Sequence, residues 1–164
     1  MKDSARIEAA YDRLDLLLER ERASAQAQQI VRLETEQVWN DQAYFLLCWG
    51  QLEIETSQVC RTAIRGRIAH SDWQVRRSWY LYDPEDKRLS GLKFEERAAL
   101  VMDRGAGKGS AWAKTMFHYT ARNEIAHGNL RSTRIDVSTF VQDCYVIQSA
   151  LHRAMWPRSL VALP

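Results

Sequence analysis

An arginine and a histidine lie five positions apart in the segment that runs from Arg122 to Gly128. Histidine changes its charge near neutral pH and can accept or donate a proton. Arginine is always charged, and its planar group matches the geometry of a phosphate. A pair of these residue types therefore suits a reaction in which a proton moves while negative charge develops on a phosphate.

The five-residue spacing alone does not identify a site, because the chain contains it twice. Arg65 and His70 are also five positions apart. With 18 arginines and four histidines, such a pair readily arises by chance. The Arg122–His127 pair must therefore be judged by the structure around it.

In a regular helix, five residues turn the chain by about 140° beyond one full circle, so Arg122 and His127 would point apart. They converge only if the helix ends or distorts between them, and Gly128 favours such an ending. Asn123 lies four positions before His127 and can orient the imidazole from the same helix face. His118 lies four positions before Arg122 and could face the same cleft.

A purely structural interpretation of the same residues stays open. Arg122 can pair with Glu124 or another neighbouring acid. His127 can act as a helix C-terminal residue, where a positive charge interacts favourably with the helix dipole.

The elements around this segment are predicted from composition and periodicity. The chain has 164 residues with only seven glycines and three prolines, which predicts an all-α fold in one domain covering residues 1–164. Apolar residues recur at helical spacing in several segments. We expect helices over residues 4–33, 38–68, 93–103, 110–128 and 138–155, with Ser4 and Ser110 as N-terminal caps and Pro157 after the last helix.

The first of these helices carries a one-sided apolar stripe at Ile7, Tyr11, Leu14 and Leu18 and then continues as a solvated rod. The second is the most apolar and should form the centre of the core. Glu53 lies beside its buried face, either as a surface charge or as a partner for an arginine of the site.

Residues 71–92 form an irregular insertion in which aromatic and basic residues alternate. Arg76 and Arg77 lie between Trp73 and Trp79, a pattern that can hold single-stranded nucleic acid. The alternative is that the aromatic residues cover the core while the charges face water. Gly105–Ser110 lacks the spacing of a phosphate-binding loop and is interpreted as a linker.

Charge and cysteine content argue against several classes of protein. A net charge of +2 produces no strong field towards nucleic acid or anionic membranes. The three cysteines, Cys48, Cys60 and Cys144, are widely spaced and indicate buried thiols of a reducing cytoplasm. The histidines and cysteines show no metal-ligand spacing, so we expect no metal and no cofactor. We also expect no membrane segment and no signal peptide.

The Arg122-Asn123-x-x-x-His127 motif, late in a chain of long helices, resembles the HEPN family of small helical-bundle proteins. That family is marked by an arginine, four to six arbitrary residues and a histidine, often with a polar residue directly after the arginine. The resemblance implies an antiparallel bundle of about four to five helices, with residues 71–92 outside the family pattern.

The resemblance also implies a function. It implies a metal-independent endoribonuclease that acts as a homodimer, with the motifs of both chains in a cleft at the interface. His127 would act as acid or base, Arg122 as phosphate clamp and Asn123 as orienter, with Glu53 and His118 in support. The products would carry 2′,3′-cyclic phosphate and 5′-hydroxyl ends. Arg131, Arg76 and Arg77 are the candidate RNA contacts.

Three functions are therefore compared. The first is a ribonuclease, as a toxin or defence effector, which could have an antitoxin or nucleotidyltransferase partner. The second is a non-catalytic helical dimer that binds a protein partner or a nucleotide. The third is a structural bundle within a larger assembly.

Overall fold

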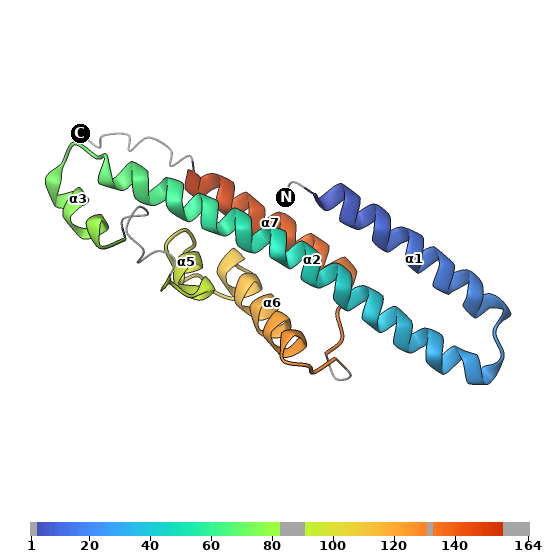
Figure 1. Cartoon of the computed structure of the whole chain (residues 1–164). Helices are drawn as coiled ribbons and strands as arrows, with labels where there is room; N and C mark the ends of the chain where they lie inside the picture. The colour runs from blue at the N-terminus through green and yellow to red at the C-terminus, as the bar shows by residue number, and fades with distance from the viewer. Residues whose placement is uncertain (1–2, 83–90, 131–132, 156–164) are drawn as a thin grey trace. The chain divides into compact units, whose positions relative to one another are not determined.

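A computed structural model describes residues 3–82, 91–130 and 133–155 (Figure 1). In these residues all regular structure is helical, so the prediction of an all-α helical bundle is confirmed. The elements are α1 (Ser4–Ser24), α2 (Ala27–Ile68), α3 (Trp73–Trp79), the 3₁₀ turn η1 (Tyr80–Tyr82), α5 (Phe94–Ala99), α6 (Ala111–Ala126) and α7 (Val137–Met155). Pro157, expected to end the last helix, lies outside the described residues.

The contacts divide the chain into two compact units. Unit 1 consists of Met1–Leu52 and Phe117–Gln142, and unit 2 consists of Glu53–Met116 and Asp143–Pro164. Helices α2, α6 and α7 contribute residues to both units. The expectation of one domain over the whole chain stays a prediction.

The predicted first helix is interrupted, which corrects the expectation of one rod through residue 33. Helix α1 ends at Ser24, and Ala25 is extended with φ −77° and ψ 145°. The backbone N–H of Gln26 then donates to Oε1 of Gln29 at 3.1 Å. A nearby side chain thus gives a partner to one of the N–H groups that helix geometry leaves unpaired at the start of α2. Helix α2 therefore begins at Ala27, eleven residues before the predicted start at Val38.

In unit 1, α1 lies antiparallel to the first part of α2 and is attached by polar contacts (Figure 1). The hydroxyl of Tyr11 donates to Oδ1 of Asp41 at 2.9 Å. Nε2 of Gln37 donates to Oδ1 of Asp15 at 2.7 Å. No α1 residue is buried, and Leu14 of the predicted apolar stripe is 52% exposed. Asp3, not Ser4, occupies the N-cap, without a side-chain cap bond.

The core of unit 1 is aromatic. Phe45 is completely buried, and its ring lies 4.7 Å from that of Phe140 in an edge-on arrangement. Trp49 stacks against Tyr119 with ring centroids 6.4 Å apart. Aromatic pairs of this kind add packing energy beyond the area they bury. The prediction that the second helix forms the centre of the core is confirmed for this part of α2.

In unit 2, a second cluster forms around Cys60 and Ile64 of α2. Trp79 and Tyr82 of the insertion pack against this cluster and are half-buried. Trp73, at the start of α3, is exposed. The aromatic residues thus divide between covering the core and facing water. Residues 83–90 of the insertion lie outside the described residues.

In unit 2, the part of α7 from Asp143 onward is joined to α6 and α2 by polar side chains. Lys114 of α6 forms an ion pair with Asp143. Nε2 of Gln148 donates to Oε2 of Glu55 at 3.1 Å. Because Asp143 and Glu55 are largely buried, these contacts supply partners that buried carboxylates require.

The structure also bears on the remaining helix ends, the cysteines and the membrane prediction. Ser110 caps α6 as expected, since its Oγ accepts from the N–H of Ala113 at 3.2 Å. Helix α5 is shorter than the predicted helix over residues 93–103. All three cysteines are buried and none forms a disulfide. Among the described residues, no helix has the length and apolar content to cross a membrane.

Candidate functional site

Helix α6 ends in a Schellman motif directly after the arginine–histidine segment. Gly128 has φ +90°, in the left-handed region that glycine adopts without steric cost. Its N–H donates to the carbonyl of Ile125 at 3.0 Å, and the N–H of Asn129 donates to the carbonyl of Glu124 at 3.0 Å. These two bonds define the motif. The prediction that Gly128 ends this helix is confirmed.

The last residue of α6 is Ala126, and His127 follows it directly. The backbone N–H of His127 still donates to the carbonyl of Asn123 at 2.9 Å, which is the regular helical pattern. The two side chains therefore leave the helix about 140° apart, on different sides. One copy of α6 does not aim both groups at one point through a helix distortion.

Arg122 and Asn123 are joined by a hydrogen bond. Nη1 of Arg122 donates to Oδ1 of Asn123 at 3.1 Å, and both residues are half-buried. The amide oxygen of Asn123 thus restrains the guanidinium, and its expected role as an orienter of the His127 imidazole stays a prediction. His127 is exposed directly after the last residue of α6. Glu124, the acid considered as an alternative partner of Arg122, accepts the hydroxyl of Thr133 at 3.2 Å.

His118 lies in the core, which corrects its expected place beside a cleft. It is 4% exposed. Its ring centroid lies 5.1 Å from those of Phe117 and Phe140 and 6.1 Å from that of Phe45. The aromatic rings around it therefore separate His118 from solvent.

Gln42 is a residue of this region that the sequence analysis missed. Its Nε2 donates to the carbonyls of Leu130 and Thr133, each at 2.7 Å. Both carbonyls belong to the connection between α6 and α7, which starts at His127. The available signal was a polar residue in helical register with Phe45 and Trp49 on the most apolar face of the chain.

The other candidate residues lie in unit 2 or outside the described residues. Glu53 is half-buried in α2. Nη1 of Arg76 donates to the carbonyls of His70 and Ser71, each at 2.6 Å, and so supports the turn between α2 and α3. The guanidinium of Arg77 lies over the ring of Trp73, 5.1 Å from its centroid. Arg131 lies outside the described residues.

The Arg65–His70 pair differs from the Arg122–His127 pair in how its histidine is used. Nδ1 of His70 accepts the backbone N–H of Asp72 at 3.0 Å. Asp72 in turn caps α3, since its Oδ1 accepts the N–H of Gln74 at 2.8 Å. His70 therefore has a structural role in a turn, whereas His127 is exposed at a helix end.

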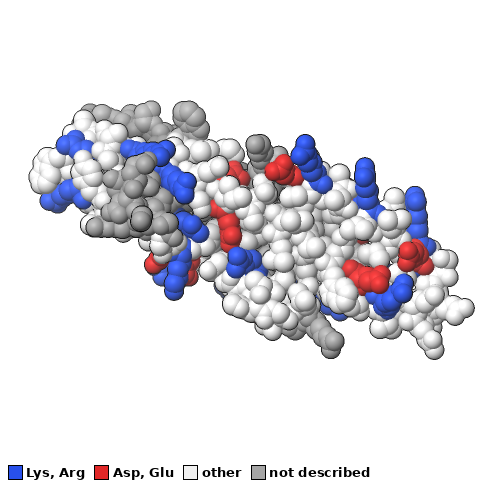
Figure 2. Space-filling model, in the orientation of Figure 1, with Lys and Arg blue, Asp and Glu red and all other residues white. Residues whose placement is uncertain are grey.

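Charge is mixed on the surface. On the face drawn in Figure 2, Lys and Arg side chains lie beside Asp and Glu and do not form one continuous basic stripe. This matches the net charge of +2. An anionic ligand would therefore be held by short-range contacts more than by a long-range field.

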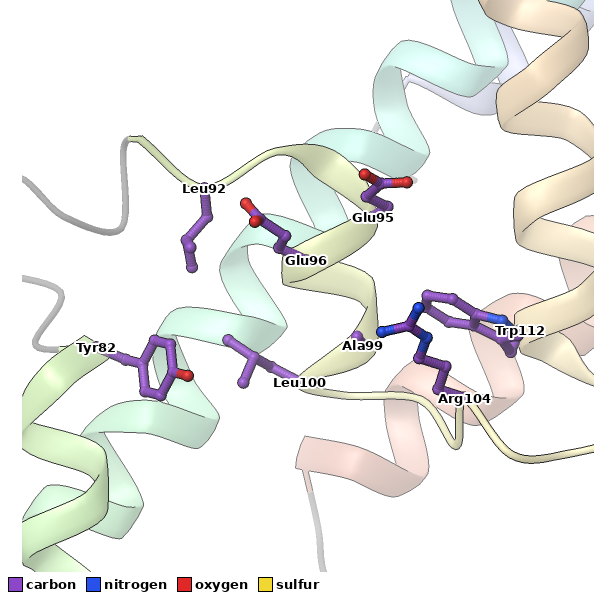
Figure 3. Close-up of a pocket in the computed structure, with 8 residues that line it drawn as sticks. All are labelled: Tyr82, Leu92, Glu95, Glu96, Ala99, Leu100, Arg104 and Trp112. Atoms are coloured by element: carbon purple, nitrogen blue, oxygen red, sulfur yellow. The ribbon is translucent and has the colours of Figure 1, made fainter.

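Unit 2 contains a pocket of about 420 Å³ on the surface of α5 (Figure 3). Its lining combines apolar, aromatic and charged side chains, namely Tyr82, Leu92, Glu95, Glu96, Ala99, Leu100, Arg104 and Trp112. The guanidinium of Arg104 lies 6.0 Å from the ring centroid of Trp112. Oε2 of Glu96 accepts the backbone N–H of Lys93 at 2.7 Å. The volume is in the range of small-molecule sites.

In the described part of the chain, no group of three or more histidine, cysteine, aspartate or glutamate side chains is placed to share a metal ion. Comparison with protein-family models, curated proteins and solved structures found no match to this chain. The fold and the site thus define an all-α protein with an exposed histidine and a restrained arginine at one helix end.

Proposed function

We propose that this protein is a metal-independent endoribonuclease of the HEPN type, acting as a toxin or defence effector. The observation that supports this most is the geometry at the end of α6. There the side chain of Asn123 accepts a hydrogen bond from the guanidinium of Arg122, and His127 is exposed directly after the last residue of α6. This combination supplies a proton-transfer group and a restrained cation within five residues.

The proposed reaction is cleavage of RNA by its own 2′-hydroxyl. His127 accepts the proton of the 2′-hydroxyl or donates a proton to the leaving 5′-oxygen. Arg122 stabilises the additional negative charge on the phosphate in the transition state. The phosphorus–oxygen bond to the 5′-oxygen breaks as the 2′-oxygen bonds to phosphorus. The products carry 2′,3′-cyclic phosphate and 5′-hydroxyl ends.

A homodimer would complete the site. Because the helical hydrogen-bond pattern continues to the backbone N–H of His127, Arg122 and His127 of one copy leave the backbone in directions about 140° apart. A second copy related by twofold symmetry would present the same residues to the same cleft. His127 of one protomer could then act with Arg122 of the other on one phosphate.

The test is RNA cleavage by the purified chain in the presence of a metal chelator. The wild type should generate cyclic-phosphate ends, and His127→Ala and Arg122→Ala should each lower the rate about a hundredfold or more. His70→Ala is the matched control, because its ring lies in a turn and its variant should cleave like the wild type. Equal cleavage by wild type and His127→Ala would exclude the assignment.

Expression provides a second test. A toxic wild type with harmless Arg122→Ala and His127→Ala variants supports a toxin, in which case an antitoxin or nucleotidyltransferase should be sought as partner. Toxicity that persists in both variants would contradict a role for this site.

The second candidate function is a non-catalytic helical dimer that binds a protein partner or a nucleotide. The pocket of unit 2 favours the nucleotide, because Trp112 and Tyr82 offer rings for a base and Arg104 offers a contact for phosphate. Glu95 on the same pocket opposes a phosphate through like charge. Saturable binding of a nucleotide that Trp112→Ala abolishes, without any RNA cleavage, would select this function over the first.

A further inference from the structure

Helix α3 carries an exposed row made of an aromatic ring, a guanidinium and a second aromatic ring. The backbone N–H of Tyr80 donates to the carbonyl of Arg76, so the helical pattern of α3 continues to Tyr80. Trp73, Arg77 and Tyr80 follow one another at spacings of four and three residues and therefore lie along one face. Trp73 is 57% exposed and Tyr80 is 53% exposed. These three residues are called the α3 row.

The α3 row is ordered without a ligand. The guanidinium of Arg77 lies 5.1 Å from the ring centroid of Trp73, and such a cation–π contact restrains both side chains. The ring of Trp73 remains more than half exposed with the guanidinium in place. A planar group that stacks on this ring therefore loses less entropy than it would on a freely moving side chain.

Other sides of α3 attach the helix to the end of α2. Nη1 of Arg76 donates to the carbonyls of His70 and Ser71, each at 2.6 Å. Trp79 packs against the buried cluster around Cys60. The contacts that hold α3 in place thus come from residues outside the α3 row.

Positive charge is concentrated in this part of unit 2. Residues 61–80 contain five arginines and one acidic residue, a net charge of +4, whereas the whole chain has +2. Arg61 and Arg65 are exposed and lie four positions apart on one face of α2. The guanidinium of Arg67 lies 5.9 Å from the ring centroid of Trp79. The end of α2 and α3 therefore form a local basic surface in a chain of small net charge.

Exposed rings and guanidinium groups together suit a single-stranded nucleic acid. Unpaired bases stack on aromatic rings whatever their sequence, while arginines contact the phosphates between them. A duplex keeps its base faces within its own stack and offers mainly its phosphates. Core packing does not account for Trp73, because most of its ring stays in water and gains little from burial.

An anionic membrane fits this surface less well. A helix that lies in a membrane interface needs a continuous apolar face. The apolar residues of α3 are Trp73, Val75 and Trp79. Trp79 packs against the cluster around Cys60, and Val75 is half-buried. Trp73 alone is exposed, so α3 does not present such a face.

We propose that the α3 row, together with the exposed arginines at the end of α2, binds single-stranded nucleic acid. A base stacks on Trp73 or Tyr80, and Arg77 contacts a neighbouring phosphate. RNA and DNA strands share the chemistry that this surface recognises. The inference does not rest on the proposed ribonuclease function, because binding requires no cleavage and all of these residues belong to unit 2.

The first test measures binding of a fluorescent oligothymidylate of about 12 nucleotides by anisotropy. This probe has no 2′-hydroxyl, so the proposed cleavage reaction cannot consume it. Trp73→Ala should weaken binding about tenfold, whereas Trp73→Phe keeps a ring and should stay within about threefold of the wild type. Trp39→Ala is the matched control, because Trp39 is similarly exposed, at 53%, but lies in unit 1. It should bind like the wild type.

The second test separates the charge from the ring. Arg77→Gln should weaken binding and also make the Kd less sensitive to salt, because one phosphate contact fewer releases fewer counterions. Trp73→Ala should leave the salt dependence unchanged. Arg32→Gln removes an exposed arginine of unit 1 and should change neither quantity. If Trp73→Ala folds poorly, Trp73→Phe and Arg77→Gln still carry the comparison.

A third arm uses 2′-O-methyl oligouridylate, an RNA strand that cannot be cleaved through its 2′-oxygen. The strand that binds more tightly identifies RNA or DNA as the ligand. If Trp73→Ala binds both strands as tightly as the wild type, the proposal is overturned. It is also overturned if a duplex of the same length binds as tightly as the single strand.

Vesicles of phosphatidylcholine and phosphatidylserine test the membrane alternative. If the wild type binds them more tightly than either strand and Trp73→Ala loses that binding, the surface is a membrane site and the proposal fails. RNA cleavage is judged separately. A wild type that cleaves no RNA would remove the ribonuclease proposal, whereas strand binding that depends on Trp73 would still support the α3 row.

Discussion

Nη1 of Arg122 donates a hydrogen bond to Oδ1 of the adjacent Asn123 at 3.1 Å, and both side chains are half-buried at the end of α6. The bond limits the positions of the guanidinium before any ligand arrives. A restrained arginine loses less side-chain freedom when it binds a phosphate. Asn123 is therefore expected to act on the arginine more than on the histidine.

The first prediction concerns Asn123. Replacing it by alanine removes the restraint on Arg122 and should lower kcat/KM for RNA about tenfold. Asn123→Asp should be worse than alanine, because a carboxylate competes with the phosphate for the guanidinium. Both variants should leave the pH dependence of kcat unchanged. A pH profile that moves with Asn123 would instead indicate that the amide orients His127.

The second prediction concerns Gly128. Its φ of +90° is unfavourable for residues with a side chain, while a Cβ built there meets no atom within 4 Å. Gly128→Ala should therefore cost about 1 kcal/mol in the free energy of unfolding for conformational reasons alone.

Gly50→Ala is the matched control. Gly50 lies inside α2, and a Cβ there also meets nothing within 4 Å, so alanine should stabilise by about 0.5–1 kcal/mol. Urea unfolding measures both, and a loss of stability in Gly50→Ala would contradict this account.

The third prediction concerns the thiol of Cys60. Burial raises the pKa of this thiol from 9.0 to about 11, although Arg97 and Arg61 oppose the shift. The folded state therefore keeps its proton at a pH where the unfolded thiol has lost it. This contribution to stability is present below pH 9 and is lost as the pH rises through 11.

The free energy of unfolding, measured in urea between pH 8 and pH 11, should therefore fall less steeply in Cys60→Ala than in the wild type. The two proteins must be compared by how steeply the free energy of unfolding changes with pH, because alanine also leaves a cavity that lowers stability at every pH. If the free energy of unfolding changes with pH in the same way in both proteins, Cys60 does not contribute to the pH dependence of stability.

The fourth prediction concerns the attachment of α1. No α1 residue is buried, and the hydroxyl of Tyr11 donates to Asp41 at 2.9 Å. Tyr11→Phe removes this bond and should cost about 1 kcal/mol. Hydrogen exchange in α1 should accelerate, while exchange in α6 stays unchanged. If α1 exchanges as slowly in Tyr11→Phe as in the wild type, its apolar contacts with α2 are sufficient to hold it.

Much of the fold follows from local properties of the chain. Scarce glycine and proline with apolar residues at helical spacing predicted an all-α chain, and α7 begins within one residue of its predicted start. Ser110 and Gly128 were identified as helix ends because capping depends on the neighbouring residues themselves. The break after Ser24 was missed, because the alanines and glutamines that follow it favour a helix. The structure shows the break where Oε1 of Gln29 accepts the backbone N–H of Gln26.

The roles of His118 and Gln42 were decided by the tertiary structure alone. His118 is four positions from Arg122, and this spacing is the same whether that helix face meets a cleft or a core. In the structure this helix face meets the core, because the rings of Phe45 and Phe140, which are distant in sequence, pack against His118. Gln42 binds carbonyls 88 and 91 positions away. Local sequence determines helices because their hydrogen bonds span four residues, whereas packing across the chain determines what each helix face contacts.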